Sequence, residues 1–313
     1  MTKQLPSSNL TKHLQCVPPT LDSIIEEDRL LAVRLIQNFL DKNKDTYGSI
    51  MCYYLDSNGN KEEFYGITAA LAWLLQKAGF HKPAKEIVDH LYEKCSLLNQ
   101  LEFPLETSEK NKGLGCMSNM VWALATGNYK VLEILRASPL YSNGLLSYSS
   151  EDEKKYLGAN IFFAIVEEIL GGNPRPILEK IAQNWNYSGG LIRVPQEQIT
   201  PDMPVLPGTL NATADANCLL AIALSKTQPD AARNIVELLK NRLVDSNNKI
   251  KPDELGGRNY DSGYQALWYL ALRSTGMEYE SAITPIREDL RNKEITSLGK
   301  IPLPIFALLR ETI

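Results

Sequence analysis

The stretches TADANCLLAIALS, residues 213–225, and PDAARNIVELLKNRLV, residues 229–244, are consecutive and opposite in character. The first is apolar and small-sided almost throughout, which is typical of a helix buried on all sides. The second carries apolar residues on one stripe and charges elsewhere, which is typical of a helix with one exposed face. Only residues 226–228 separate them, so a very short turn joins these two helices, and their contrast predicts an inner ring and an outer ring.

The same alternation runs along the rest of the chain. Further segments of the apolar type lie at 65–79, 116–127, 156–172 and 260–276. The inner segments share the pattern polar-x-x-large-small-large, which begins at Thr68, Asn119, Asn160, Asn217, Tyr264 and, more weakly, Leu303. The first and last copies are 235 residues apart, so the five intervals average 47 residues, a length typical of two-helix repeats.

Six helical hairpins follow from this repeat. We group each outer helix with the inner helix that follows it, with outer helices at 24–40, 83–97, 129–136, 174–184, 229–243 and 278–291. The spacing is irregular and the sequence has no polar capping repeats, which favours a closed ring over an open solenoid. The sequence therefore predicts an all-α fold, an α/α toroid of the (α/α)6 barrel type. We expect one domain over 21–313 after an N-terminal arm over 1–20.

Composition limits the partners and the compartment. The 313 residues are 44% hydrophobic and 22% charged, a globular balance, and the net charge of −4 argues against nucleic acid as a partner. No segment is long and apolar enough for a membrane span or a signal peptide. The five cysteines form no C-x-x-C pair and the three histidines lack close metal-ligand spacing. We therefore expect free thiols in the cytoplasm, no metal and no cofactor.

The connections differ between the two ends of the hairpins. The inner-to-outer turns are very short, whereas the outer-to-inner loops 41–64, 98–115, 137–156, 185–213 and 244–260 take 17 to 29 residues. Loops of that length often carry function, although they could also only cap the barrel. We expect a small-molecule ligand in the central cavity, where these loops reach the N-terminal ends of the inner helices. The sequence leaves the oligomeric state open.

Two pairs of phrases carry a resemblance to a known superfamily. NYSGGL at 186–191 precedes ADANCLLAIAL at 214–224, and LVDSNNKI at 243–250 precedes YDSGYQAL at 260–267. Such a turn before an inner helix that opens with aspartate and small residues resembles the terpenoid cyclase and protein prenyltransferase superfamily. The resemblance implies an α/α toroid that acts on an isoprenoid-like substrate. The Asp-x-Asp-Asp acid of the cyclases and the zinc ligands of the transferases are absent from this sequence.

Two aspartates are the candidate catalytic residues. Asp215 and Asp261 fall in the first turns of expected inner helices, where the helix dipole and free backbone N–H groups favour a carboxylate. They could act as a base, a nucleophile or a cation stabiliser, or they could only cap their helices. A glycosidase also needs a protonated carboxyl group. The loops offer several candidates for it, namely Glu62, Glu63, Glu151, Asp152 and Glu254.

Three asparagines are candidate substrate-binding residues. Asn119, Asn160 and Asn217 occupy one repeat position in successive hairpins. Asparagine is unfavourable inside a helix and in a core unless its amide is hydrogen-bonded. The three could form a polar ring around the cavity, or they could act as structural brackets to neighbouring loops.

Aromatic and basic residues near the long loops complete the candidate binding set. Tyr65, Tyr260 and Tyr264 could stack on a sugar ring or steady a carbocation. Arg258, like Arg193, could bind an anionic group in fork geometry or pair with a nearby acid.

Three functions are compatible with these features. The superfamily resemblance implies a small-molecule enzyme similar to terpenoid cyclases or prenyltransferases. The asparagines, tyrosines and loop carboxylates also suit a carbohydrate-active hydrolase or lyase on an (α/α)6 barrel. The absence of an intact motif leaves a non-enzymatic toroidal binding module as the third hypothesis.

Overall fold

The structure is a computed structural model. It describes residues 21–47, 53–55, 61–63, 65–97, 115–147, 155, 157–185, 187, 189–195, 210–256, 260–291 and 302–310. The predicted N-terminal arm, residues 1–20, lies outside this part of the chain.

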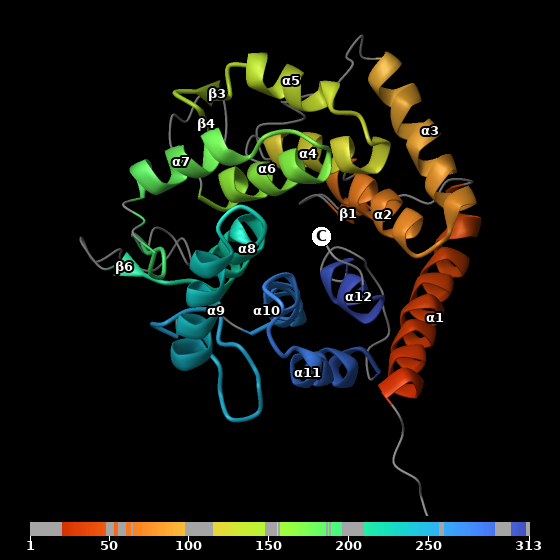
Figure 1. Ribbon diagram of the computed structural model, residues 1–313. Helices are drawn as coiled ribbons and strands as arrows, with labels where there is room; N and C mark the ends of the chain where they lie inside the picture. Colours follow the sequence, from red (N-terminus) through yellow and green to blue (C-terminus); the bar gives the residue numbers. More distant parts are fainter. Residues whose placement is uncertain are drawn as a thin grey trace, which may run out of the picture.

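The helices form two concentric rings (Figure 1). The inner ring consists of α2 (Tyr65–Lys77), α4 (Gly115–Thr126), α6 (Leu157–Ile169), α8 (Ala214–Leu224), α10 (Ser262–Ser274) and α12 (Pro302–Leu308). The outer ring consists of α1 (Leu21–Tyr47), α3 (His81–Leu97), α5 (Lys130–Ala137), α7 (Arg175–Asn184), α9 (Pro229–Leu243) and α11 (Glu280–Arg291). Neighbouring inner helices contact each other all the way round, and α12 returns to α2. This closed ring confirms the predicted α/α toroid.

The hairpins are grouped differently from the sequence-based prediction. Each inner helix contacts the outer helix that follows it, as in α2 with α3 and α8 with α9. The prediction had grouped each outer helix with the inner helix after it, and this grouping is wrong. Short turns return the chain antiparallel onto the same hairpin, whereas the long loops lead to the next one. The sixth hairpin therefore combines α12 with α1, from opposite ends of the chain.

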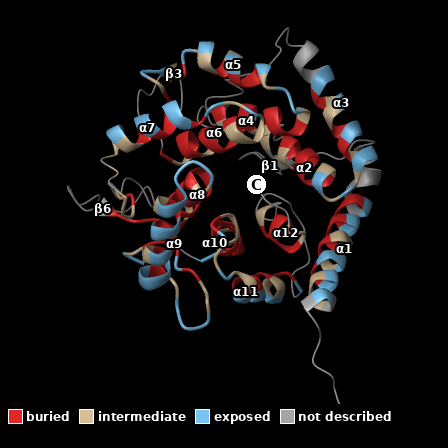
Figure 2. Cartoon of the chain, in the orientation of Figure 1, coloured by how far each residue is buried: buried red, intermediate tan, exposed pale blue. Residues whose placement is uncertain are grey.

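Burial explains why the two helix types alternate (Figure 2). In α8 every residue except Asp215 and Leu219 is buried, because the helix lies between neighbours in the inner ring and the outer helix α9. The outer helix α9 buries only one stripe, which consists of Ala232, Ile235, Val236, Leu239 and Leu243. The buried set has the three-to-four-residue spacing of one helix face.

Four of the five short turns, those after α2, α4, α6 and α10, share one geometry. At the end of α4, the N–H of Asn128 donates to the carbonyl of Ala123 at 3.1 Å, and the N–H of Gly127 donates to that of Leu124 at 3.4 Å. Gly127 has a φ of 64°, the left-handed conformation that this Schellman motif requires. The same pair of bonds follows α2, α6 and α10 at Gly79, Gly171 and Gly276.

Short antiparallel ribbons, which the sequence analysis did not predict, lie in three of the long loops. They pair β1 (Tyr53–Leu55) with β2 (Lys61–Glu63), β3 (Tyr141–Ser142) with β4 (Leu145–Leu146), and β5 (Val194–Pro195) with β6 (Leu210–Asn211). The ribbons β1–β2 and β5–β6 end within three residues of the inner helices α2 and α8.

The described residues contain neither a membrane-spanning helix nor a cluster of metal ligands. None of the helices there combines the length and hydropathy needed to cross a bilayer. Within the same ranges, no three His, Cys, Asp or Glu side chains gather closely enough to hold a metal ion.

Candidate functional site

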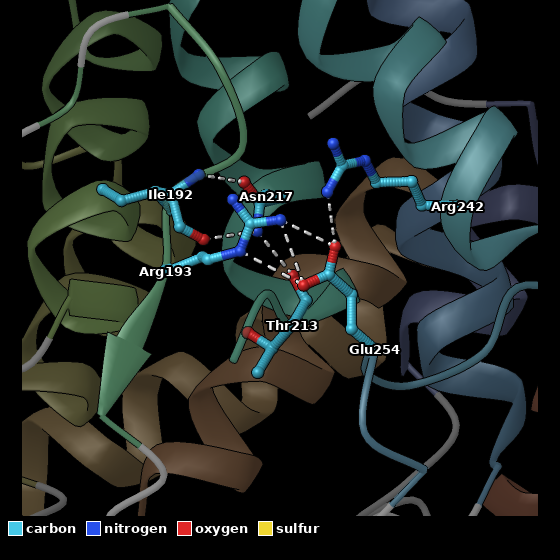
Figure 3. A network of polar contacts seen from close by, with 6 residues as sticks. All are labelled: Ile192, Arg193, Thr213, Asn217, Arg242 and Glu254. Carbon is cyan, nitrogen blue, oxygen red and sulfur yellow. Dashed lines mark hydrogen bonds and ion pairs between the residues drawn. The ribbon is translucent and has the colours of Figure 1, made fainter. Parts of the chain in front are cut away.

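The N-terminal ends of the inner helices carry buried amide side chains that hold the incoming loops. In α8, the amide of Asn217 donates to the carbonyl of Ile192 at 3.0 Å and accepts from the N–H of the same residue at 2.8 Å (Figure 3). It also donates to the carbonyl of Thr213 at 2.8 Å. Asn217 is fully buried. Its amide therefore pairs with both the N–H and the carbonyl of one loop residue.

The same amide bracket recurs in two other inner helices. Asn160 of α6 accepts from the N–H of Leu146 at 2.7 Å and donates to its carbonyl at 3.0 Å. In α10 the bracket is Gln265, which accepts from the N–H of Ile250 at 3.0 Å. It also donates to the carbonyls of Asn248 and Ala282.

These contacts decide between the two roles considered for the asparagines. The amides of Asn160 and Asn217 are both buried and bound to backbone, so the structure favours brackets over a cavity-lining ring for these two. Asn119 is buried at the same repeat position of α4. Gln265 was missed because the repeat pattern selected Tyr264. The sequence did offer a signal for Gln265, because it is the lone amide in a largely apolar helix. Its side chain is one methylene longer than that of asparagine.

An ion cluster lies directly beside the Asn217 bracket. Arg193 follows the bracketed Ile192 and donates to Glu254 through Nε at 3.2 Å and Nη2 at 2.8 Å. Arg242, at the end of α9, donates to the same carboxylate at 3.1 Å. Figure 3 shows the three side chains converging between the loop, α8 and α9. Because two guanidinium groups share one carboxylate, this cluster keeps one unit of net positive charge.

Glu254 is therefore held ionised. Burial alone would raise its pKa, but the hydrogen bonds and charges of Arg193 and Arg242 outweigh burial and lower the pKa. A general acid needs a raised pKa. This argues against Glu254 as the protonated carboxyl. It also shows that Arg193 pairs with an acid, which was one of its two expected roles.

Asp215 is a half-buried carboxylate in the first turn of α8. Its Oδ1 accepts from the N–H of Ala216 at 2.8 Å. Beneath it, the thiol of Cys218 is fully buried, and its pKa is raised by burial and secondarily by the charge of Asp215. We call the end of the toroid where the long loops reach the N-terminal ends of the inner helices the loop face. Asp215 is partly exposed at this end, so a ligand on the loop face could reach it.

Asp261 has the capping geometry. It is the N-cap of α10, and its carboxylate accepts from the N–H groups of Gly263 at 2.8 Å and Tyr264 at 3.3 Å. The side chain is exposed, so these bonds leave part of the carboxylate open to solvent. The structure supports the capping role of Asp261.

Tyr260 lies exposed beside the same helix end. The ammonium of Lys249 lies 5.5 Å from the centre of its ring, a cation–π contact. Partial burial and the nearby carboxylates Asp289, Asp261 and Asp245 raise the pKa of Tyr260, so the phenol stays protonated. Tyr264 is half-buried one turn into α10.

The remaining candidates are only partly covered by the described residues. Arg258, Glu151 and Asp152 lie outside them. Tyr65 begins α2, while Glu62 and Glu63 belong to β2, where Glu62 is paired with Tyr54.

Comparison with solved structures finds the same architecture in carbohydrate-active proteins. The chain is similar to an unsaturated glucuronyl hydrolase specific for heparin, with a TM-score of 0.51 and 10% identity over 90% of this chain and 88% of that one. A second similar structure is an unsaturated glucuronyl hydrolase from Streptococcus agalactiae, with a TM-score of 0.46 and 12% identity over 93% and 78%. No protein-family model and no curated protein sequence matches the chain.

At 10% identity, the first likeness establishes the α/α toroid and nothing finer. It gives no support to the terpenoid cyclase and prenyltransferase interpretation.

Proposed function

We propose that this protein is a carbohydrate-active enzyme, a hydrolase or a lyase, which binds a saccharide at the N-terminal ends of its inner helices. The observation that carries the proposal is the likeness to the heparin-specific glucuronyl hydrolase, which extends over nine-tenths of this chain. A carbohydrate-active enzyme is the second of the three functions compatible with the sequence. In our proposal this function takes the place of the isoprenoid hypothesis.

In this proposal Asp215 is the catalytic carboxylate. It lies in the first turn of α8, and its Oδ1 accepts from the N–H of Ala216. A half-buried carboxylate at that position suits a base that removes a proton from the sugar or activates a water molecule. Asp261, which caps α10, would support the site from the neighbouring helix.

The proton donor has to come from another carboxyl group. The lowered pKa of Glu254 makes it a poor donor. The proposed candidates for the proton donor are Glu62, Glu63, Glu151 and Asp152. Tyr65, Tyr260, Tyr264 and Arg258 are proposed to contact the sugar, together with Asn119.

The net positive charge of the cluster formed by Arg193, Arg242 and Glu254 favours an acidic saccharide. Arg193 and Arg242 share Glu254 and keep one net positive charge beside the Asn217 bracket. Arg242 is about half-exposed, with a side-chain exposure of 49%, so its guanidinium is open to an incoming anion. A sugar carboxylate or sulfate would pair with it in fork geometry.

A thermal-shift panel tests this proposal. The ligands are uronic-acid oligosaccharides, neutral oligosaccharides and isoprenyl diphosphates. A ligand at a hundred times its Kd stabilises the fold by about 2.7 kcal/mol. We expect the acidic saccharides to raise the Tm more than the neutral ones. Stabilisation by the isoprenyl diphosphates alone would contradict the proposal.

The variant Arg242→Gln separates charge from shape in the same assay. We expect it to reduce the shift with acidic saccharides and to leave the shift with neutral ones unchanged. Lys240→Gln is the matched control, because it removes one exposed positive charge from the same turn of α9. Equal losses in both variants would indicate nonspecific attraction.

A further inference from the structure

The toroid closes between the two ends of the chain. Five hairpins, from α2–α3 to α10–α11, are each joined by a short turn of the backbone. The sixth pairs α12 with α1, and the whole described ring lies between them in the sequence. We call the contact of α1 with α11, α12 and the residues directly after α12 the seam. The ion pairs between described residues of the seam join Asp28 to Arg287 and Arg310, and Glu27 to Arg291.

A buried carboxylate lies at the seam. Asp28 of α1 has no exposed surface. Arg287 of α11 donates to both of its oxygens, at 2.5 and 2.8 Å. Arg310, which follows α12, donates to it at 2.9 Å and also bonds to Glu280 of α11. The carboxylate of Asp28 thus joins α1 to two segments whose arginines are 259 and 282 residues away in sequence.

The helices at the seam depend on one another. An isolated helix of seven residues, the length of α12, is unstable in water. α1 buries Ala32, Leu35, Ile36 and Phe39, and it contacts α12. Buried charges also tolerate the loss of a partner poorly, because the remaining charges stay desolvated.

We infer that α1 and α12 form one split hairpin that opens as a unit, and that Asp28 is the latch that keeps it closed. When the latch is released, the toroid becomes an open arc of five hairpins that keep their own turns. This conformational device does not rest on the proposed saccharide site, whose residues lie on other elements, among them α2, α4, α8, α9 and α10.

Hydrogen exchange of the full chain tests the latch with a matched pair of variants. Asp28→Asn removes the buried charge. Glu27→Gln removes the adjacent charge, which is 60% exposed and pairs with Arg291 at 3.5 Å. We expect Asp28→Asn to accelerate exchange in both α1 and α12 by at least about tenfold and to leave α8 and α9 unchanged. Glu27→Gln should exchange as the unmodified protein does.

Two results would overturn the inference. One is equal acceleration in every helix of Asp28→Asn, which would mean a global loss of stability. The other is acceleration of α1 without α12, which would mean that the two helices are not one unit.

The unmodified protein provides a second test if Asp28→Asn fails to fold. Exchange is measured at rising urea concentrations below the unfolding transition. We expect the amides of α1 and α12 to merge into one opening reaction, at less urea than the amides of α8 and α9. Exchange of all four helices in a single global reaction would contradict the split hairpin.

Discussion

A primary amide can pair with both the N–H and the carbonyl of one residue in an extended loop, because it carries a donor and an acceptor side by side. Asn160 and Asn217 use this property to hold one loop residue each. Gln265 holds two residues of its loop, Ile250 by its amide oxygen and Asn248 by its amide nitrogen. The bracket aligns each loop with its inner helix. In α8 it also places Arg193 next to Glu254, so it helps to set the charge of the loop face.

Replacing the Asn217 amide by a carboxylate tests the bracket. In Asn217→Asp, an ionised oxygen would face the carbonyls of Ile192 and Thr213 in a buried position. We expect a loss of about 2 to 3 kcal/mol in the free energy of unfolding, measured by urea titration.

Asn173→Asp is the control for this change. Asn173 is exposed and only accepts, from the N–H of Arg175, which a carboxylate does equally well. We expect a change within about 0.5 kcal/mol. A similar loss in both variants would show that the bracket has no special role.

The ion cluster predicts a pH dependence of stability. The pKa of Glu254 in the folded protein lies below its ordinary value of 4.5, so its stabilising contribution is complete above that value. The contribution disappears as the pH falls through the lowered pKa.

Thermal melts at decreasing pH measure this contribution. We expect the Tm difference between the unmodified protein and Glu254→Gln to be largest at neutral pH and to shrink below about pH 4.5. Glu237→Gln, an exposed change on α9, should show no such trend. A difference that grows on acidification would mean that the sign of the pKa shift is wrong.

At the scale of elements, a sharp turn follows most inner helices and sets the hairpin. Schellman motifs close α2, α4, α6 and α10 with a left-handed glycine. These turns were visible in the sequence as glycines at the ends of apolar segments. The ribbons were not visible, because their strands are only two or three residues long and are fixed by tertiary contacts.

Two glycine variants should change stability in opposite directions. Gly127→Ala forces a side chain into a φ of 64°, which costs about 1 to 2 kcal/mol. Gly158→Ala lies within α6, where an added Cβ meets open space. We expect it to stabilise the fold by about 0.4 to 1 kcal/mol, because it reduces the freedom of the unfolded chain. Urea midpoints measure both, and equal signs would contradict the assigned turn.

At the scale of the whole molecule, the closed ring could be predicted, but the helix pair that closes it could not. Alternation of buried and amphipathic helices is a local property, so the sequence alone indicated two rings and a toroid. The pairing of α12 with α1 depends on contacts such as Arg310 with Asp28, which no local pattern contains. The sequence allowed the bracket role of Asn160 and Asn217 but could not choose it over a cavity-lining role, because their partners are backbone groups of loops.

The central claim is that the loop face of this toroid acts on an acidic saccharide through Asp215. The most direct measurement is turnover of an unsaturated glucuronyl disaccharide by the unmodified protein, Asp215→Asn and Asp230→Asn. Asp230 is the matched control, because it is also the second residue of a helix, α9, and its side chain is fully exposed. We predict that Asp215→Asn lowers the rate by at least about a hundredfold and that Asp230→Asn leaves it unchanged. An undiminished rate in Asp215→Asn, or no turnover by the unmodified protein, would contradict the account.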